Sequence, residues 1–317
     1  MRSAFMLSVF VCLTLNLGVC QAADEDTAVM RPIQPWESVL LGIVEGVTEY
    51  LPISSTGHLV LTSHYLGLSK FVEDEGGEET RLVKAPSLDT FSIVIQAGAI
   101  LAVLGLYRKR VVEMIEGVLG RSREGLHLLI VLVIAFLPAA VVGLLFRDMI
   151  HKFLFSPVTV AAALALGGVF MIVVEKVWYD REEADSRWPD FHRLTYRKAL
   201  IIGLFQCLAL CPGVSRSMVT IVGGILVGLD MVAAAEFSFL LALPTLGGAT
   251  FYEGLKEYEG LTQDNSGVTV LLGVAVSCVV AAVSVRALVT WLTRHGLVSF
   301  GYYRIALGAV VLGVFLF

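Results

Sequence analysis

The chain has 317 residues, of which 56% are hydrophobic and 16% charged, and its mean hydropathy is +0.80. Soluble globular domains are only about 45–50% apolar, so this composition excludes a soluble domain and predicts an integral membrane protein. The net charge of −5, without a basic tail or zinc-finger spacing, argues against a nucleic-acid partner.

Residues 1–23 have the pattern of a secretory signal peptide. Arg2 is followed by an apolar run from Ala4 to Gly18 and by small residues before the acidic segment at Asp24. Because the apolar run is short for a full span, we expect a cleaved leader and a mature N-terminus outside the cytoplasm. An uncleaved leader that serves as an extra anchor is the alternative.

Residues 38–67 form two short apolar pieces around Pro52. At 1.5 Å per residue, neither piece crosses a hydrocarbon core of about 30 Å, which predicts a re-entrant helix-loop-helix that dips into the membrane and returns. Glu45 and Glu49 lie one helical turn apart on the same face of the first piece. Two carboxylates at such a short separation favour a bound cation or a shared proton between them.

The second piece begins with hydroxyl residues. Ser54, Ser55 or Thr56 can cap a helix that carries His58, and the free N–H groups at its start attract an anion such as phosphate. Ser55 or His58 supplies a nucleophile or a general base. Polar groups of these kinds within an apolar membrane segment predict a functional site.

The rest of the chain is dominated by long apolar segments. An acidic linker at residues 69–87 is expected to be an exposed loop. Six segments are long enough to cross a bilayer, at residues 88–107, 126–146, 157–177, 231–250, 268–290 and 300–317. The predicted fold class is therefore an all-α integral membrane protein with six transmembrane helices plus two re-entrant helix-loop-helix pairs.

The second re-entrant pair, residues 198–229, repeats the layout of the first. Pro212 breaks it, and Ser215, Arg216 and Ser217 follow the break. The planar guanidinium of Arg216 suits phosphate oxygens. Corresponding residues of the two pairs are 160 or 161 positions apart: Gly42 and Gly203, Pro52 and Pro212, Gly67 and Gly228. This spacing predicts an internal repeat with halves at residues 35–178 and 198–317.

The charges of the loops predict the orientation. Connections 108–125 and 176–198 are rich in Arg and Lys, whereas 69–87 and 251–267 are acidic. The positive-inside rule places the basic connections in the cytoplasm, so the first broken pair enters from outside and the second from the cytoplasm. We therefore predict an inverted-topology repeat, in which the broken helices meet near the middle of the bilayer.

Three other charged residues and three glycine pairs lie within apolar segments, and their positions predict local contacts. Arg286 and Arg304 are expected to snorkel to a membrane surface. Glu236 is expected to make an interhelical hydrogen bond or ion pair, with Arg216 as one candidate partner, and the alternative is that it faces the site. Three glycine pairs predict close helix packing, namely Gly167-Gly168, Gly223-Gly224 and Gly247-Gly248.

Two motifs carry a resemblance to a known family. Glu45 to His58 reads E-G-V-T-E-Y-L-P-I-S-S-T-G-H, and Pro212 to Ser217 reads P-G-V-S-R-S. At these motifs the sequence resembles the undecaprenyl pyrophosphate phosphatases, also called the bacitracin-resistance phosphatases, and the resemblance extends from about residue 36 to the C-terminus. Met218 stands where the family pattern usually has glycine, a departure that bears on the backbone after Arg216.

The resemblance implies an enzyme and a set of site residues. It implies catalysis at Glu49, Ser55, His58 and Arg216, with Glu45 and Glu49 holding a divalent cation, Mg²⁺ or Ca²⁺. Substrate contacts are expected from the neighbouring hydroxyls, which are Ser54, Thr56, Ser215 and Ser217. Ser55 is the preferred nucleophile, with Glu49 or His58 as base, and phosphohistidine at His58 is the rival route.

The implied reaction converts undecaprenyl pyrophosphate to undecaprenyl phosphate and inorganic phosphate. It takes place at the outer leaflet of the bacterial inner membrane, with the site open to the periplasm, and it recycles the lipid carrier of cell-wall synthesis. The expected partners are this substrate and membrane lipid, and a homodimer is left open. A polyprenyl-phosphate flippase or an ion-coupled anion carrier is the alternative function, with Arg216 binding the anion and Glu49 carrying a proton or cation.

The predicted orientation is tested by labelling. Gly76→Cys should react with a membrane-impermeant thiol reagent in intact cells, and Ala184→Cys should not, because the charge rule places these loops on opposite sides. The unsubstituted chain gives the background from native cysteines. The reverse pattern would overturn the orientation and move the mouth of the site to the cytoplasm.

Overall fold

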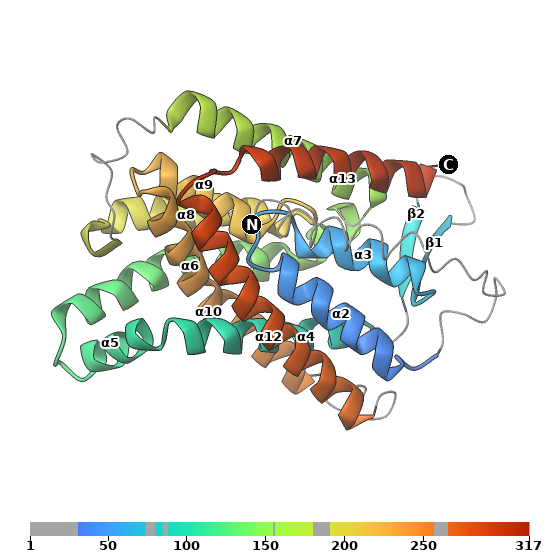
Figure 1. Cartoon of the computed structure of the whole chain (residues 1–317), viewed down its shortest axis with the longest axis horizontal. Helices are drawn as coiled ribbons and strands as arrows, with labels where there is room; N and C mark the ends of the chain where they lie inside the picture. Colours follow the sequence, from blue (N-terminus) through green and yellow to red (C-terminus); the bar gives the residue numbers. More distant parts are fainter. Residues whose placement is uncertain are drawn as a thin grey trace.

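The computed structural model describes residues 31–73, 80–84, 88–154, 156–179, 191–256 and 266–316. The expected signal peptide, together with residues 74–79, 85–87, 180–190 and 257–265 of the predicted loops, lies outside these ranges. The described chain is helical apart from one hairpin (Figure 1). The long helices are α4 (Leu88–Leu106), α6 (Arg123–Leu154), α7 (Pro157–Trp178), α10 (Met231–Lys256), α12 (Gly267–Leu292) and α13 (Val298–Leu316).

The short helices form the two predicted broken pairs. The first is α2 (Pro35–Thr48) and α3 (Ser55–Tyr65), and the second is α8 (Tyr196–Cys207) and α9 (Arg216–Leu226). Three further short elements are the helix α5 (Arg108–Val118) and the 3-10 turns η3 (Phe191–Arg193) and η4 (Leu208–Leu210).

Within the described residues, five helices are long and apolar enough to cross a membrane, and they lie in α4, α6, α7, α10 and α12. The sixth predicted span is the helix α13, whose apolar stretch Val298–Val314 is shorter. The chain is therefore an all-α, multi-pass membrane protein. The total of six crossings stays a prediction.

Two connections differ from the sequence-based expectation. The acidic linker contains an antiparallel hairpin of β1 (Ser69–Glu73) and β2 (Thr80–Lys84), with Ser69 opposite Lys84. The expectation of a plain loop was wrong for these strands, because the acidic composition obscured a Phe-Val and a Leu-Val pair that favour β structure. The basic connection after α4 holds the helix α5.

The same local chemistry begins the second helix of each broken pair. Ser54 and Ser215 are the N-caps, with φ of 74° and 75°, and they are the only described non-glycine residues with positive φ. Each hydroxyl accepts from a backbone N–H three residues on, Gly57 N at 3.4 Å and Met218 N at 3.3 Å. Left-handed backbone in a non-glycine residue is uncommon and strained, so its recurrence at matching positions marks the two breaks as equivalent.

The packing of the first helices is also equivalent. α2 packs against α12, and α8 packs against α6. A Cβ at Gly42 would lie 2.6 Å from the Gly273 carbonyl oxygen, and a Cβ at Gly203 would lie 2.6 Å from the Ala135 carbonyl oxygen. Each broken pair therefore rests on a long helix from the other predicted half.

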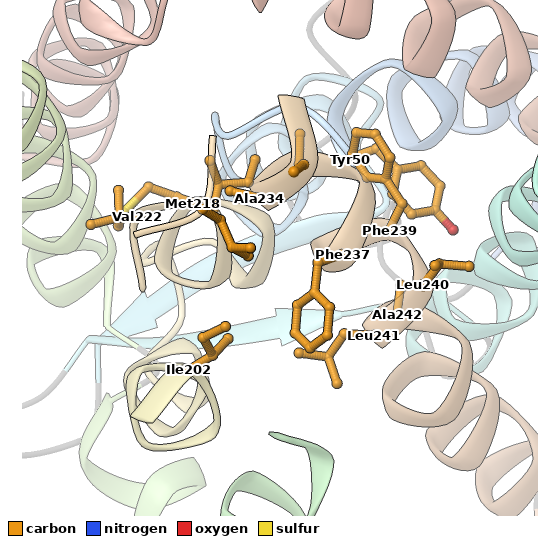
Figure 2. Packing of buried hydrophobic residues seen from close by; sticks show 14 of the residues in the cluster. Tyr50, Ile202, Met218, Val222, Ala234, Phe237, Phe239, Leu240, Leu241 and Ala242 are labelled. Atoms are coloured by element: carbon orange, nitrogen blue, oxygen red, sulfur yellow. The ribbon is translucent and has the colours of Figure 1, made fainter. Parts of the chain in front are cut away.

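The main hydrophobic core surrounds the second broken pair. Met218 and Val222 of α9 and Phe237 and Phe239 of α10 are almost fully buried and belong to the same core as Tyr50, from the first break, which lies beside Phe239 (Figure 2). The rings of Tyr50 and Phe239 meet edge to face at 5.5 Å. The core thus joins the end of α2 to α10.

The expected close packing at paired glycines is confirmed in two of three cases. A Cβ at Gly168 would lie 2.5 Å from the Gly301 carbonyl oxygen, and one at Gly224 would lie 2.8 Å from the Cβ of Ala234. The expectation was wrong for Gly247 and Gly248, where an added Cβ would meet nothing within 4 Å.

Gly203→Ala should destabilise the protein. Its new methyl group would overlap the α6 backbone, and overpacking of this kind costs about 1–3 kcal/mol. Gly105→Ala is the matched control, because an added Cβ there meets nothing within 4 Å. Thermal unfolding in detergent measures the stability of both variants. An unchanged melting temperature in Gly203→Ala would contradict the α8–α6 contact.

Candidate active site

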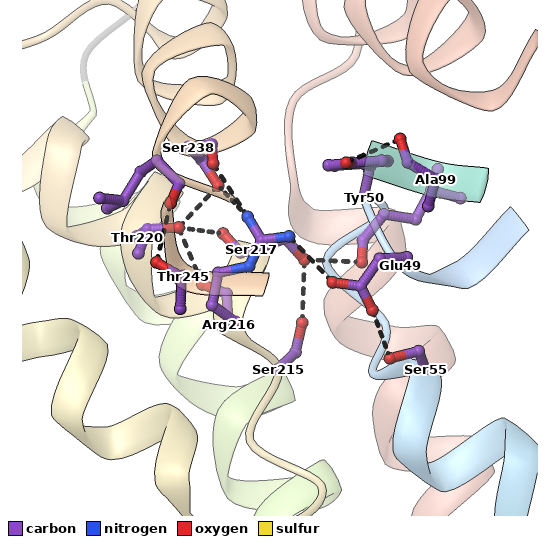
Figure 3. Close-up of polar contacts among 12 residues, drawn as sticks. Glu49, Tyr50, Ser55, Ala99, Ser215, Arg216, Ser217, Thr220, Ser238 and Thr245 are labelled. Atoms are coloured by element: carbon purple, nitrogen blue, oxygen red, sulfur yellow. Dashed lines mark hydrogen bonds and ion pairs between the residues drawn. The ribbon is translucent and has the colours of Figure 1, made fainter. Parts of the chain in front are cut away.

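The two breaks meet through side chains that are distant in sequence. Arg216 Nη2 lies 2.9 Å from Glu49 Oε1, across a separation of 167 residues. Ser217 Oγ donates to the Leu51 carbonyl at 2.8 Å. Figure 3 shows Glu49 on the α2 side facing Arg216 on the α9 side. The residues after Pro212 and those before Pro52 therefore form one site.

Glu49 is the centre of this site. Its Oε1 pairs with Arg216, and its Oε2 accepts a hydrogen bond from Ser55 Oγ at 2.8 Å (Figure 3). The exposed fractions of the two charged side chains are 5% for Glu49 and 9% for Arg216. A buried carboxylate bonded to a serine hydroxyl can accept its proton, which is the arrangement of a general base and a nucleophile.

Arg216 is held by α10 as well as by Glu49. Its Nη1 donates to the Ser238 carbonyl at 2.9 Å, and its guanidinium lies 5.6 Å from the centre of the Tyr50 ring. The Ser238 hydroxyl is 2.6 Å from Thr220 Oγ1. Arg216 Nε is buried and has no hydrogen-bond partner within the described residues, so one donor of the guanidinium remains available for an anion.

The predicted substrate-contacting hydroxyls differ in their present contacts. Ser54 Oγ is a helix cap, and Ser217 Oγ is bonded to Leu51 O. Ser215 Oγ accepts from Met218 N and lies 3.0 Å from Ser217 Oγ. Thr56 is half-buried in the first turn of α3. All four lie at the helix starts beside Glu49 and Arg216, and their contact with substrate stays a prediction.

His58 is not bonded to the proposed nucleophile. Its Nδ1 lies 2.7 Å from the Ser54 carbonyl oxygen, and its Nε2 lies 2.6 Å from Tyr303 Oη. Since a carbonyl can only accept, Nδ1 carries a proton, and in a neutral ring Nε2 then accepts from the Tyr303 hydroxyl. Both ring nitrogens are thus engaged by groups other than Glu49 and Ser55.

Glu45 fits a role as a cation ligand. It is fully buried, and neither carboxylate oxygen has a hydrogen-bond partner within the described residues. Carboxylate oxygens are the ligands that Mg²⁺ and Ca²⁺ prefer, and Glu49 lies one turn further along. In the described part of the chain no three His, Cys, Asp or Glu residues lie together so that they could hold a metal ion, so Glu45 and Glu49 would need oxygens from substrate or water to complete a coordination shell.

The structure also places Arg304, Glu236 and Met218, which the sequence singled out. Arg304 does not snorkel: it is 0% exposed and donates to carbonyls of both breaks. Glu236 on α10 accepts a hydrogen bond at 3.4 Å from the hydroxyl of Tyr107, which lies between α4 and α5, while Arg216 pairs with Glu49. The unusual Met218 is compatible with the helix start, since its side chain is buried and its N–H bonds to the cap.

Sequence reasoning missed Tyr303, Arg304 and Ser238 as parts of the site. Tyr303 and Arg304 lie on α13, remote in sequence from both motifs. The only available signal was an arginine within an apolar segment, which hydropathy alone assigns to the membrane surface.

The fold and the site define a multi-pass membrane protein in which a buried carboxylate contacts a guanidinium and a serine hydroxyl between two pairs of broken helices. Residues 38–310 match the family described as "Bacitracin resistance protein BacA". The chain belongs to this family, which confirms the resemblance carried by the two motifs.

Curated relatives cover most of the chain. It is 46% identical over 278 residues to the undecaprenyl-diphosphatase of Sorangium cellulosum (strain So ce56), a match that spans 87% of this chain and 85% of that protein. It is 41% identical over 276 residues to undecaprenyl-diphosphatase 1 of Stutzerimonas stutzeri (strain A1501), spanning 87% and 92%. It is 40% identical over 283 residues to the undecaprenyl-diphosphatase of Acinetobacter baumannii (strain ATCC 17978), spanning 89% and 96%.

The state of His58 is measurable by ¹⁵N NMR of histidine-labelled protein. We expect the Nδ1-protonated tautomer, because the Ser54 carbonyl requires a donor. Tyr303→Phe should shift the Nε2 resonance, since Nε2 loses its donor, while Tyr302→Phe, at a residue 57% exposed, should leave it unchanged. A proton on Nε2 in the native protein would contradict this geometry.

Proposed function

We propose that this protein hydrolyses undecaprenyl diphosphate to undecaprenyl phosphate and inorganic phosphate. Membership of the BacA family and the name shared by the three relatives support this activity. The observation that carries it is the continuous contact from Ser55 through Glu49 to Arg216. A nucleophile, a base and a phosphate-binding cation are the parts that phosphoryl transfer requires.

In the proposed reaction Ser55 attacks the terminal phosphorus. Glu49 accepts the proton of Ser55 Oγ as the Oγ–P bond forms, and the bond from phosphorus to the bridging oxygen breaks, releasing undecaprenyl phosphate. Water then attacks the phosphoserine, and Glu49 returns its proton to Ser55 Oγ as the Oγ–P bond breaks, which restores the Ser55 hydroxyl and releases inorganic phosphate that keeps the hydrogens of the water. The 2.8 Å hydrogen bond between Ser55 and Glu49 supports these roles.

Arg216 would stabilise the charge that spreads over the phosphoryl oxygens. Its guanidinium has a donor without a partner in the described residues, and it lies beside the N-terminal ends of α3 and α9. Helix N-termini attract anions, and preorganised donors in a water-poor site stabilise a transition state strongly. Binding of the phosphate requires Arg216 to share its Nη2 between Glu49 and the substrate.

We assign His58 a positioning role. The rival route through phosphohistidine needs a free ring nitrogen, whereas Nδ1 is bonded to Ser54 and Nε2 to Tyr303. Its bond to the Ser54 carbonyl instead helps to fix the strained cap from which Ser55 follows. This supports Ser55 over His58 as the nucleophile.

Glu45 and Glu49 would hold the divalent cation, Mg²⁺ or Ca²⁺. The carboxylate of Glu45, fully buried and without a hydrogen-bond partner among the described residues, supports this assignment. When bound, such a cation would neutralise phosphate charge.

The proposed location is the bacterial inner membrane, with the site open to the periplasm. The charge pattern of the loops supports this orientation. The equivalent caps at Ser54 and Ser215, and the exchange of packing partners between α2 and α8, support an inverted repeat. Hydrolysis on that side would recycle the lipid carrier of cell-wall synthesis and give resistance to bacitracin.

The equivalent breaks also favour a second candidate, a polyprenyl-phosphate flippase or ion-coupled anion carrier, since repeats of this kind are common in transporters. In that case Arg216 would bind the anion and Glu49 would carry a proton or cation. Transport alone breaks no phosphoric anhydride bond.

Phosphate release decides between the two. The purified protein in detergent, given undecaprenyl diphosphate and Mg²⁺ or Ca²⁺, should release inorganic phosphate, and a chelator should suppress the release. A pure folded protein that releases none with either cation would refute the phosphatase and favour the carrier.

Arg216→Lys should lower turnover about 100-fold or more, because lysine keeps the charge but loses the fork that bonds Glu49, Ser238 and phosphate together. Arg286→Lys is the matched control, since Arg286 is an exposed arginine in an apolar helix. Near-normal turnover in Arg216→Lys would remove this residue from the phosphate.

A further inference from the structure

Arg304 is a fully buried cation on α13, with an exposed fraction of 0%. Every hydrogen bond that it makes within the described residues ends on a backbone carbonyl. Its donors reach Pro52 O at 3.4 Å from Nη1, Gly213 O at 2.9 Å and Ala163 O at 3.2 Å from Nη2, and Leu164 O at 3.3 Å from Nε. A cation inside a membrane protein is costly and marks a functional role.

The acceptors lie on the two breaks and on α7. Pro52 is in the first break, three residues after Glu49, and Gly213 is in the second, three residues before Arg216. Because the guanidinium is planar and rigid, its bonds to both carbonyls fix the separation of the breaks. The carbonyls of Ala163 and Leu164 hold the same guanidinium to α7.

Two glycines lie where a side chain would disturb this arrangement. A Cβ at Gly167 would lie 2.4 Å from Arg304 Nη2. Gly213 has φ of +93°, a left-handed conformation that glycine adopts readily, and a Cβ there would lie 2.6 Å from the Val160 carbonyl oxygen. Side chains at either position would displace Arg304 or the break that it holds.

We propose that Arg304 is a positioning residue for the hydrolysis: through the carbonyls of Pro52 and Gly213 it sets the distance between Glu49 and Arg216. It does not touch the reacting groups, and it acts by holding both breaks to α7. This inference rests on the proposed function, since it concerns the same site.

The first test variant displaces the Arg304 side chain without replacing the residue. Gly167→Ala should lower kcat about 10- to 100-fold with KM changed less than about threefold, because a displaced break spoils the transition-state geometry more than substrate capture. Gly308→Ala is the matched control. Its Cβ would lie 2.8 Å from the Ala161 carbonyl oxygen, so it strains the same α7–α13 pair away from Arg304.

Arg304→Lys supplies a second variant that introduces no clash. One ammonium cannot reproduce the bidentate reach to both breaks, so kcat should again fall while the melting temperature stays close to that of Gly308→Ala. Wild-type kcat in both variants would overturn the proposal, and so would an equal loss in Gly308→Ala. Loss of folded protein in both Gly167→Ala and Arg304→Lys would make Arg304 a residue of the fold alone and would also overturn it.

Phosphate release by the wild-type protein distinguishes a failure of this inference from a failure of the proposed function. An unsubstituted protein that releases no phosphate refutes the phosphatase, and the role of Arg304 in the reaction falls with it. An active wild type with equally active variants refutes only the role of Arg304.

Discussion

The ion pair between Glu49 and Arg216 is the contact on which the site depends. Removing two charges from water costs several kcal/mol for each ion, so a buried pair is weak evidence for stability and stronger evidence for a function that needs both charges. Here the pair joins the two helix breaks through residues that are 167 positions apart. It also orients Glu49 so that its other oxygen bonds Ser55.

The breaks themselves are imposed by local chemistry. A proline, which lacks an N–H and clashes with a preceding helical turn, lies four residues after the end of α2 and five after the end of α8, and a serine in left-handed backbone starts each second helix. The two breaks are equivalent in backbone but not in side chains, since Ser55 follows Ser54 where Arg216 follows Ser215. One predicted half of the repeat thus supplies the nucleophile and the base, and the other supplies the guanidinium of Arg216.

The sequence was sufficient to predict the broken pairs and the Glu49, Ser55 and Arg216 set, because proline, capping residues and buried charge leave direct patterns. It did not predict Arg304 or Tyr303. Their roles depend on acceptors, such as the Pro52 carbonyl, that every residue type offers and that only the fold brings near. The hairpin at β1 and β2 was missed for a different reason, since strand pairing depends on a partner segment as much as on composition.

The central claim is that both breaks act as one catalytic unit, and a double-mutant cycle in phosphate release tests it most directly. Residues that act as a unit are strongly non-additive when removed. Glu49→Gln combined with Arg216→Ala should therefore turn over little more slowly than the more damaging single variant. Losses that multiply in the double variant would show that Glu49 and Arg216 work independently, and would contradict a shared site.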